Sequence, residues 1–260
     1  MTKKSKKKDQ KMSLKTILNY SPNFNSKKRN LKQIKFIIFH YTGMKSETAA
    51  VKKLTKIQSE VSSHYFIKNN GEIISMVPDL YSAWHAGVSF WKGKSSLNKN
   101  SIGIEISNPG HAFNYKKFSI KQIKSIIKIG KYLINTYKIK PQNILGHSDI
   151  APFRKKDPGE KFPWKYLAKK KIGIWHSLNQ SKLLKNRGFK INKLEKKIYI
   201  KNLIKIGYNL GFKNNSKIKK NRNLKIISKA FQRRFRQDVI DGIIDKECLL
   251  ISQNLVKKLD

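Results

Sequence analysis

Three histidines of this chain lie in segments where a histidine could do chemistry. His40 ends the apolar run IKFIIFH, His85 lies in AWHAG, and His147 begins HSDIAPFRKKDPG, which contains Asp157 ten residues later. A zinc ion that supports hydrolysis takes three protein ligands, typically histidine nitrogens and a carboxylate, and leaves a fourth position for water. His40, His147 and Asp157 could supply that set, although 107 residues separate His40 from His147 and no HExxH motif is present.

Glu105 is a further residue of chemical interest because of the strand on which we expect it. In SIGIEIS, isoleucines at 102, 104 and 106 alternate with Gly103 and Glu105. Alternate side chains of a strand face opposite sides, so Glu105 would point away from the isoleucines and be held on a rigid element. It could act as a general acid and base, or it could only pair with one of the 58 Lys and Arg residues.

The segments around these residues predict strands that alternate with helices. IKFIIFH is rich in β-branched and aromatic residues and suits a strand buried on both faces. Ser119, with Gln122 three residues later, forms a capping box ahead of an amphipathic helix. The other expected elements are a helix from about 46, a hairpin around 69–71, and strands over 101–107 and 143–145. This order predicts an α/β or α+β domain.

The chain changes character after residue 175. Residues 176–190 are polar and basic without a clear period, so we expect a linker there. Residues 191–260 show helical spacings and no strand signal, which predicts a small all-α domain. Residues 1–20 are expected to form a basic, solvated tail, and 21–175 the first domain. With this division, removal of everything after 175 should spare turnover of a soluble substrate.

Five segments carry a resemblance to a known family. They are, in order, FIIFHYTGM, VSSHYFI, AWHAGVSFW, LNKNSIGIEISNPG and ILGHSDIAPFRKKDPGEKFPW. Together they resemble the zinc-dependent N-acetylmuramoyl-L-alanine amidases of the type 2 amidase family, which share a fold with the peptidoglycan recognition proteins. The resemblance covers about residues 21–175. It implies an α/β domain with a central mixed β-sheet flanked by helices, which cleaves the amide bond between N-acetylmuramic acid and L-alanine in peptidoglycan or muropeptides.

The resemblance also implies roles for individual residues. The ligands that it implies for one zinc ion are His40, His147 and Asp157. Glu105 would activate the zinc-bound water, and Lys155 would stabilise the oxyanion. Lys156 is adjacent to Lys155, and either could be a solvated surface charge, but the register of the resemblance favours Lys155.

Other residues near these motifs could have either a structural or a functional role. Asp149 lies close to His147 but is expected to cap the following turn, and His64 is expected to be structural and not a ligand. Aromatic faces pack on sugar rings, which makes nearby aromatic residues candidates for lining a groove. The substrate-binding candidates are Tyr41, Trp84, His85, Trp91 and Asn98, each of which could instead be buried or structural.

The C-terminal segments IKNLIKIGYNL and ISKAFQRRFRQDVIDGIIDKE are similar to the helical peptidoglycan-binding module often attached to such amidases. The sequence departs from that pattern at Cys248, where threonine is often found. We expect Phe231 and Phe235 in the core of this domain. The residues expected at its surface are Arg233, Arg234 and Arg236.

Composition limits the classes of binding partner that we expect. The 260 residues carry 58 Lys and Arg against 15 Asp and Glu, a formal net charge of +43, part of which we ascribe to the residue usage of A/T-rich codons. This charge attracts anionic polymers in general, but no nucleic-acid motif is recognisable. Peptidoglycan or a muropeptide is therefore the expected partner. The alternative to an enzyme is a module of the same fold that recognises muropeptides without cleaving them.

Cysteine content and hydropathy bear on location. A single cysteine excludes an internal disulfide and a multi-cysteine zinc site. No apolar run approaches the ~20 residues of a membrane span, and the basic N-terminal segment lacks the apolar stretch of a secretory signal. We therefore expect a cytoplasmic monomer, with the periplasm or cell envelope as the alternative location.

Overall fold

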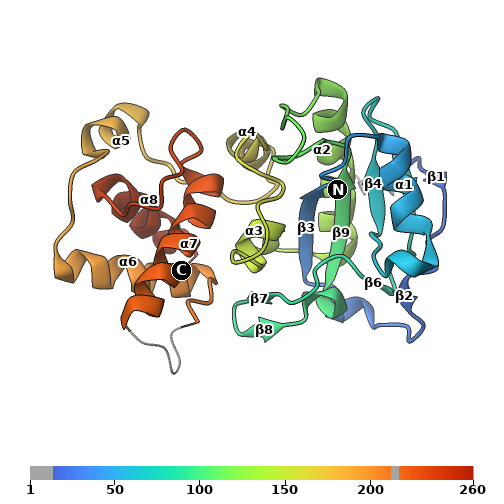
Figure 1. Cartoon of the computed structure of the whole chain (residues 1–260), viewed down its shortest axis with the longest axis horizontal. Coiled ribbons are helices and arrows are strands. Elements are labelled where there is room, and N and C mark those ends of the chain that lie inside the picture. The colour runs from blue at the N-terminus through green and yellow to red at the C-terminus, as the bar shows by residue number, and fades with distance from the viewer. Residues whose placement is uncertain (1–13, 212–216, 260) are drawn as a thin grey trace, which may run out of the picture.

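A mixed sheet lies at the centre of the N-terminal part of the chain (Figure 1). The computed structural model describes residues 14–211 and 217–259, and within them the largest sheet has six strands in the order β1-β5-β4-β9-β3-β10. Their bounds, in that order, are Ile17–Leu18, Ile73–Ser75, Tyr65–Ile67, Ser101–Ile106, Phe36–Tyr41 and Ile144–Gly146. β4 and β5 pair antiparallel, and the other neighbours pair parallel. The predicted central mixed sheet is confirmed.

The alternation of β3 and β9 gives the sheet two different faces. Ile37 and Phe39 of β3 and Ile104 of β9 pack in one apolar cluster with the buried residues of α2 (Ile120–Tyr137). Successive side chains of a strand point to opposite faces, so His40 and Glu105 lie on the face away from α2. One face thus packs on α2, whereas the other carries His40 and Glu105 together with Ile38, which is buried in a different apolar cluster.

Several helices and strands begin at the residues that the local sequence predicts. Ser46 caps α1 (Glu47–Thr55), and Ser119 with Gln122 forms the capping box of α2. β4 and β5 form the predicted hairpin around residues 69–71. The other short strands and helices of this part are β2 (Phe24–Asn25), β6 (Ser82–Ala83), β7 (Phe90–Trp91), β8 (Lys94–Ser95), α3 (His147–Ile150) and α4 (Trp164–Lys169), with 3-10 turns at Leu31–Gln33, Ile57–Ser59, Leu97–Asn100 and Pro141–Asn143.

The described residues after 175 form helices, as the sequence predicts, and we call 176–259 the helical region. Its helices are α5 (Gln180–Asn186), α6 (Lys193–Ile206), α7 (Lys217–Phe235) and α8 (Lys246–Lys257). Figure 1 shows them grouped beside α3 and α4, at the end of the molecule opposite α1. Phe231 and Phe235 are buried in its core, as expected.

The segment 176–190 is not simply a linker, because it contains α5. Asn179 caps this helix by accepting the Ser181 N–H at 2.8 Å, and the buried Leu183 packs into the core shared with α8. One cap and one apolar anchor hold a helix of two turns, and this signal is too short to produce a visible period in the sequence.

The N-terminal tail also differs from expectation. Ile17 and Leu18, within the expected tail 1–20, form β1 and pair with β5, while residues 1–13 lie outside the described residues. The side chains of Ile17 and Leu18 are exposed. Backbone hydrogen bonds therefore hold β1, and its side-chain pattern gives no sign of it.

The prediction of surface arginines is wrong for all three. Arg233, Arg234 and Arg236 are 8%, 2% and 3% exposed. Arg234 pairs with Asp149 at 2.5 Å and Arg236 with Asp245 at 2.6 Å. A buried guanidinium needs such a partner, and the partner is supplied by another part of the fold, so a local reading of AFQRRFR could not foresee it.

One apolar core continues from the sheet into the helical region. Ile38 of β3 and Leu145 of β10 belong to the same cluster of buried residues as Leu203 and Phe231. At its edge the indole of Trp91 packs on the ring of Tyr208, with centroids 4.9 Å apart. The two parts of the chain are thus joined by continuous packing.

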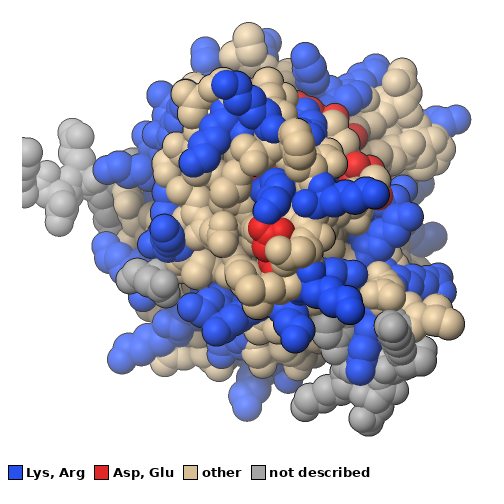
Figure 2. Space-filling model, turned by 90° about the vertical axis from the view of Figure 1, so that its left-hand side faces the viewer, with Lys and Arg blue, Asp and Glu red and all other residues tan. Residues whose placement is uncertain are grey.

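The surface carries the excess charge in a dispersed form. Figure 2 shows Lys and Arg side chains scattered over the face presented by the helical region, among neutral residues. In the described part of the chain, no helix has the length and apolar character that crossing a membrane requires.

Candidate active site

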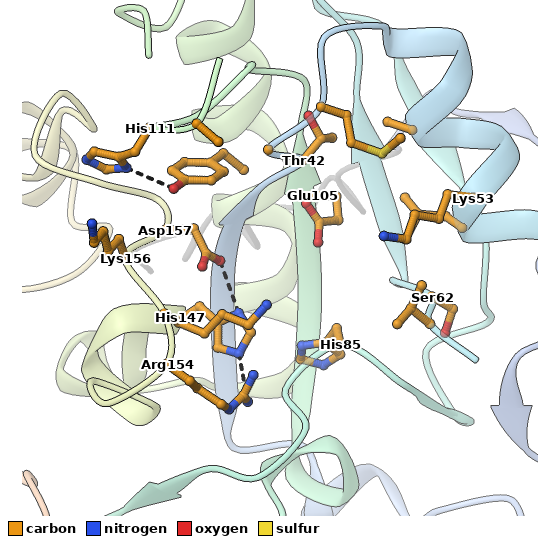
Figure 3. A pocket seen from close by; sticks show the side chains of 18 of the residues that line it. Thr42, Lys53, Ser62, His85, Glu105, His111, His147, Arg154, Lys156 and Asp157 are labelled. Carbon is orange, nitrogen blue, oxygen red and sulfur yellow. Dashed lines mark hydrogen bonds and ion pairs between the residues drawn. The ribbon is translucent and has the colours of Figure 1, made fainter. Parts of the chain in front are cut away.

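A pocket of about 580 Å³ opens where β3 ends, with β9 and α1 at its sides (Figure 3). Tyr41 and Thr42 line it at the end of β3, and Asp157 lines it from the loop that follows α3. Loops and strand ends of this kind commonly carry ligand and catalytic groups because a rigid scaffold fixes them. Most of the residues singled out in the sequence lie here.

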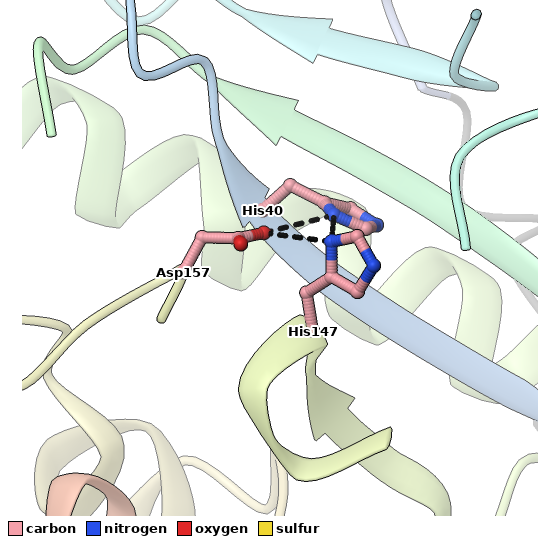
Figure 4. Close-up of side chains that lie close together, drawn as sticks. All are labelled: His40, His147 and Asp157. Carbon is pink, nitrogen blue, oxygen red and sulfur yellow. Dashed lines mark hydrogen bonds and ion pairs between the residues drawn. The ribbon is translucent and has the colours of Figure 1, made fainter. Parts of the chain in front are cut away.

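Two imidazoles and one carboxylate meet at the floor of the pocket (Figure 4). His40 Nδ1 lies 2.9 Å from His147 Nδ1, and Asp157 Oδ2 lies 3.1 Å and 3.0 Å from these two nitrogens. All three residues are buried. The end of β3, the first residue of α3 and a loop ten residues further on thus bring three donor atoms to one point.

Two groups contact the outer nitrogen of His147. Its Nε2 lies 3.1 Å from the carbonyl oxygen of Ala86, which can only accept a hydrogen, and 3.2 Å from Nη2 of Arg154, which can only donate one. Arg154 also donates to the same Ala86 oxygen and anchors the loop that carries it. These contacts hold the ring with its Nδ1 directed at His40 and Asp157.

A chain of hydrogen bonds assigns the tautomer of His40. Ser101 donates its only hydroxyl hydrogen to Leu97 O at 2.7 Å, so it accepts from His85 Nε2 at 3.1 Å. His85 Nδ1 then accepts from His40 Nε2, 3.0 Å away. His40 Nδ1 is left with its lone pair, which points at His147 and Asp157. Partners of this kind orient metal-binding histidines.

Gly103 makes this chain possible by its lack of a side chain. A Cβ at position 103 would lie 2.4 Å from Cγ of the His85 ring, closer than real Cβ atoms approach. The glycine of SIGIE therefore leaves the space in which His85 reaches His40.

The electrostatics of the His40, His147 and Asp157 cluster favour the binding of a cation. Burial, followed by the charge of His147, lowers the pKa of His40 to about 4, so its ring is neutral at pH 7. Burial alone would raise the pKa of Asp157, but interactions with His147 and His40 outweigh it and hold this pKa below its ordinary value. Two imidazole nitrogens and a carboxylate form a donor set that fits Zn²⁺.

Glu105 lies beside the cluster with an unused oxygen. β3 and β9 pair in parallel so that Glu105 is directly opposite His40. Burial, followed by the charge of Asp157, raises the pKa of Glu105 to about 8. Its Oε2 has no hydrogen-bond partner among the described residues. A buried carboxyl with a raised pKa and a free oxygen is suited to accept and return a proton.

Three lysines line the pocket. Lys155 and Lys156 come from the loop before Asp157. Lys53 comes from α1 on the side of Glu105, whereas Lys156 lies beyond Asp157 (Figure 3). Lys155 is partly buried and Lys156 exposed. The positive charge of Lys155 acts on both Glu105 and His40, lowering their pKa values. This placement agrees with the preference for Lys155.

The substrate-binding candidates are divided by the structure. Tyr41, Trp84 and His85 line the pocket, and the Tyr41 hydroxyl bonds to His111 Nδ1 at 2.8 Å. Trp91 does not line it, because its side chain is 1% exposed and packs against the helical region. Asn98 also lies outside the pocket lining. Its Oδ1 accepts the backbone N–H groups of His85 and the next residue, so it holds the loop in place.

His64 has the structural position expected of it, and Asp149 is structural as expected but caps the start of its own helix instead of the following turn. His64 is fully buried, and its Nδ1 accepts the Gly103 N–H at 3.0 Å. Asp149 Oδ2 accepts the Gly146 N–H at 2.8 Å and so caps the start of α3. Neither belongs to the His40, His147 and Asp157 cluster.

Several pocket residues escaped the sequence analysis. Arg154 stands in the quoted FRKKD segment, but nothing in its local pattern shows that it reaches Ala86 and Val88. His111 joins Tyr41 to Glu160, whose Oε2 is 3.0 Å from His111 Nε2. These contacts bring together residues up to 70 positions apart in the sequence. Local periodicity carries no information about contacts between residues so far apart.

One pocket brings together two histidines, an aspartate and a nearby glutamate, which come from a strand end, a helix start, a loop and a second strand. This is the arrangement of a metal-dependent hydrolase. Comparison with known proteins gives a more specific answer. The family profile described as N-acetylmuramoyl-L-alanine amidase matches residues 30–160. The chain is 33% identical over 238 residues to N-acetylmuramoyl-L-alanine amidase AmiD of Escherichia coli, covering 87% of this chain and 83% of that protein.

Solved structures agree. A complex of E. coli AmiD with anhydro-N-acetylmuramic acid-L-Ala-D-γ-Glu-L-Lys superposes with a TM-score of 0.74 at 34% identity, over 87% of this chain and 90% of that one. AmpDh3 of Pseudomonas aeruginosa superposes with a TM-score of 0.75 at 30% identity, over 91% and 96% of the two chains. This chain therefore belongs to the N-acetylmuramoyl-L-alanine amidase family, as the five motifs indicated.

Proposed function

We propose that this chain is a zinc-dependent amidase that hydrolyses the bond between N-acetylmuramic acid and L-alanine in peptidoglycan or muropeptides. His40, His147 and Asp157 would hold one zinc ion. The observation that carries the proposal is the convergence of two Nδ1 atoms and a carboxylate oxygen within 3.1 Å of one another, beside Glu105.

The proposed roles follow from charge. When bound, zinc lowers the pKa of a water molecule towards ~7 and polarises the scissile carbonyl. Glu105 takes up the proton from the attacking water at its free oxygen and passes it to the departing amine of L-alanine. Lys155 places its ammonium where negative charge develops on the carbonyl oxygen. His85 keeps the Nδ1 of His40 unprotonated and correctly directed.

The pocket supports a muropeptide as the substrate. Trp84 and Tyr41 offer aromatic faces to a sugar or peptide, and Arg154 with the pocket lysines gives a cationic rim for the carboxylates of a stem peptide. The solved structure of E. coli AmiD, 34% identical to this chain, is a complex with an anhydromuramyl peptide. We infer the same class of substrate here, bound by a monomer.

We assign peptidoglycan binding to the helical region, which would hold the enzyme near its polymer. A second pocket of about 420 Å³ lies there, lined by the exposed Phe189 and Ile243 and by Lys196 and Lys225. Aromatic and cationic side chains together suit a polymer of sugars and acidic peptides. Replacement of Phe189 by Ser should weaken pelleting with insoluble wall while leaving turnover of a soluble muropeptide unchanged.

The experiment that tests the catalytic proposal measures zinc content and the release of L-alanine-headed peptide from a purified muropeptide. It compares wild type with His147→Ala, with and without a chelator. Chelator-sensitive release that disappears in the variant supports the proposal. Muropeptide binding without cleavage by the zinc-loaded wild type would instead make the chain a recognition module.

A further inference from the structure

The helical region reaches the metal cluster through one buried carboxylate, Asp149. This residue is 1% exposed and stands two positions after His147 in α3. Its Oδ1 accepts the hydroxyl hydrogen of Tyr208 at 2.7 Å, and its Oδ2 accepts Nη1 of Arg234 at 2.5 Å. Tyr208 follows α6 and Arg234 belongs to α7, so both come from the other end of the chain.

The same carboxylate holds the start of α3. Asp149 Oδ2 also accepts the N–H of Gly146, the residue immediately before His147. Arg234 makes a second bond across this turn, from Nη2 to the carbonyl oxygen of Ile144 at 2.7 Å. Two residues of the helical region therefore fix the backbone on both sides of His147.

Packing leaves Arg234 little freedom. Its guanidinium lies over the ring of Trp164, 4.4 Å from the ring centre, and the side chain is 2% exposed. A buried ion pair is a poor source of stability, because desolvation of the two charges offsets much of their attraction. A contribution to folding stability is therefore a weak explanation for an arginine at position 234. A role in positioning the metal site explains this buried arginine better.

We infer that Arg234 and Tyr208 are positioning residues of the metal site. Through Asp149 they hold the first turn of α3, and with it the direction in which His147 Nδ1 points. The helical region would then be a working part of the hydrolase as well as a module for polymer binding. This inference rests on the proposed function, since it assumes that His147 binds zinc.

The chain offers a matched control in Arg236. This side chain is also buried, at 3% exposure, and also forms an ion pair, with Asp245 at 2.6 Å. That pair lies wholly within the helical region, away from α3. Arg234→Met and Arg236→Met therefore remove the same charge from neighbouring positions and differ in which carboxylate loses its partner.

The experiment measures zinc affinity of the metal-free full-length protein by chelator competition, together with kcat and KM for a muropeptide. We expect Arg234→Met to lower zinc affinity by about tenfold or more and to lower kcat with little change in KM. Tyr208→Phe, which removes one oxygen, should act in the same direction. Arg236→Met should keep wild-type zinc affinity even where its midpoint of urea unfolding falls.

A double-mutant cycle guards against a variant that fails to fold. The losses of zinc affinity for Tyr208→Phe and Asp149→Asn should be non-additive, because both act on one carboxylate. Wild-type zinc affinity in folded Arg234→Met or in Tyr208→Phe, or additive losses in the cycle, would overturn the inference while the amidase assignment stands. Failure of the wild type to bind zinc would instead remove the proposed function itself.

Discussion

His40 and Glu105 occupy directly opposite positions on the adjacent parallel strands β3 and β9. The pairing places the proposed zinc ligand and the proposed base on the same face of the sheet. A shift of one residue in this register would turn Glu105 to the face that packs on α2 and Ile104 to the pocket face. The distance between the two groups is therefore set by the strand pairing and not by a loop.

Replacement of Glu105 by Gln should abolish most of the hydrolysis while leaving zinc bound. The amide has nearly the same shape but cannot take up a proton, so we expect kcat to fall by about 10²- to 10⁴-fold. Zinc content and kcat are measured on the same preparation. Glu72→Gln, in the exposed hairpin ion pair with Lys68, is the control and should change neither value. Full activity in Glu105→Gln would end the catalytic role of this residue.

The raised pKa of Glu105 predicts how the stability of the metal-free protein depends on pH. Because this pKa rises from 4.5 in the unfolded chain to about 8 in the folded one, the folded state binds the extra proton between these values. The free energy of unfolding should therefore fall as pH rises from about 4.5 to 8. Urea unfolding at both pH values, for wild type and Glu105→Gln, isolates the effect. An equal pH dependence in the two proteins contradicts it.

His85 should behave as a positioning residue and not as a substrate contact. His85→Ala removes the acceptor of the His40 Nε2 hydrogen, which frees the ring to rotate or change tautomer. We expect zinc affinity to fall by about 10- to 100-fold with KM little changed. Ser101→Ala, one bond further away, should give a smaller loss. A raised KM with unaltered zinc affinity would return His85 to the substrate-binding residues.

The two adjacent lysines allow a paired comparison. Lys155 acts electrostatically on Glu105 and His40, whereas Lys156 is exposed at the pocket edge. Lys155→Met should lower kcat by about 10²- to 10³-fold, the usual effect of losing a group that stabilises an oxyanion. Lys156→Met should remain within a few-fold of wild type. The opposite ranking of kcat values would transfer the role to Lys156.

The continuous core predicts that the chain unfolds as one unit. Removal of residues after 175 would expose apolar side chains of β3 and β10, among them Ile38 and Leu145. We therefore expect the truncated protein to be insoluble or strongly destabilised, against the expectation of separable domains. The full-length chain should show one urea transition by both fluorescence and circular dichroism. Two separated transitions, or an active soluble fragment 1–175, would contradict this view.

The packing at Trp91 shows why the sequence alone favoured separable domains. In FWKGK nothing distinguishes a groove tryptophan from a buried one. Its indole lies against Gly207, where a Cβ would be 2.5 Å from the ring, and against Tyr208. Both partners are more than 110 residues away in the sequence, so no local pattern records the contact.

Local signals determined the main elements of this protein, although not β1 or α5. The β-branched run of β3, the alternation of SIGIEIS and the capping box of α2 each depend on residues a few positions apart, and each gave the element that the structure contains. Part of the site was also predictable from local sequence, because His147 and Asp157 lie ten residues apart in one segment. The resemblance of five ordered motifs supplied the link to His40 and Glu105.

Tertiary structure alone decided how those elements work together. The register of β3 on β9, the hydrogen-bond chain from Ser101 to His40, and the burial of Arg234 against Asp149 all join residues distant in sequence. The physical reason is that periodicity reports which side of an element is apolar, whereas the partner of a buried charge or ring is fixed only when the chain folds back on itself.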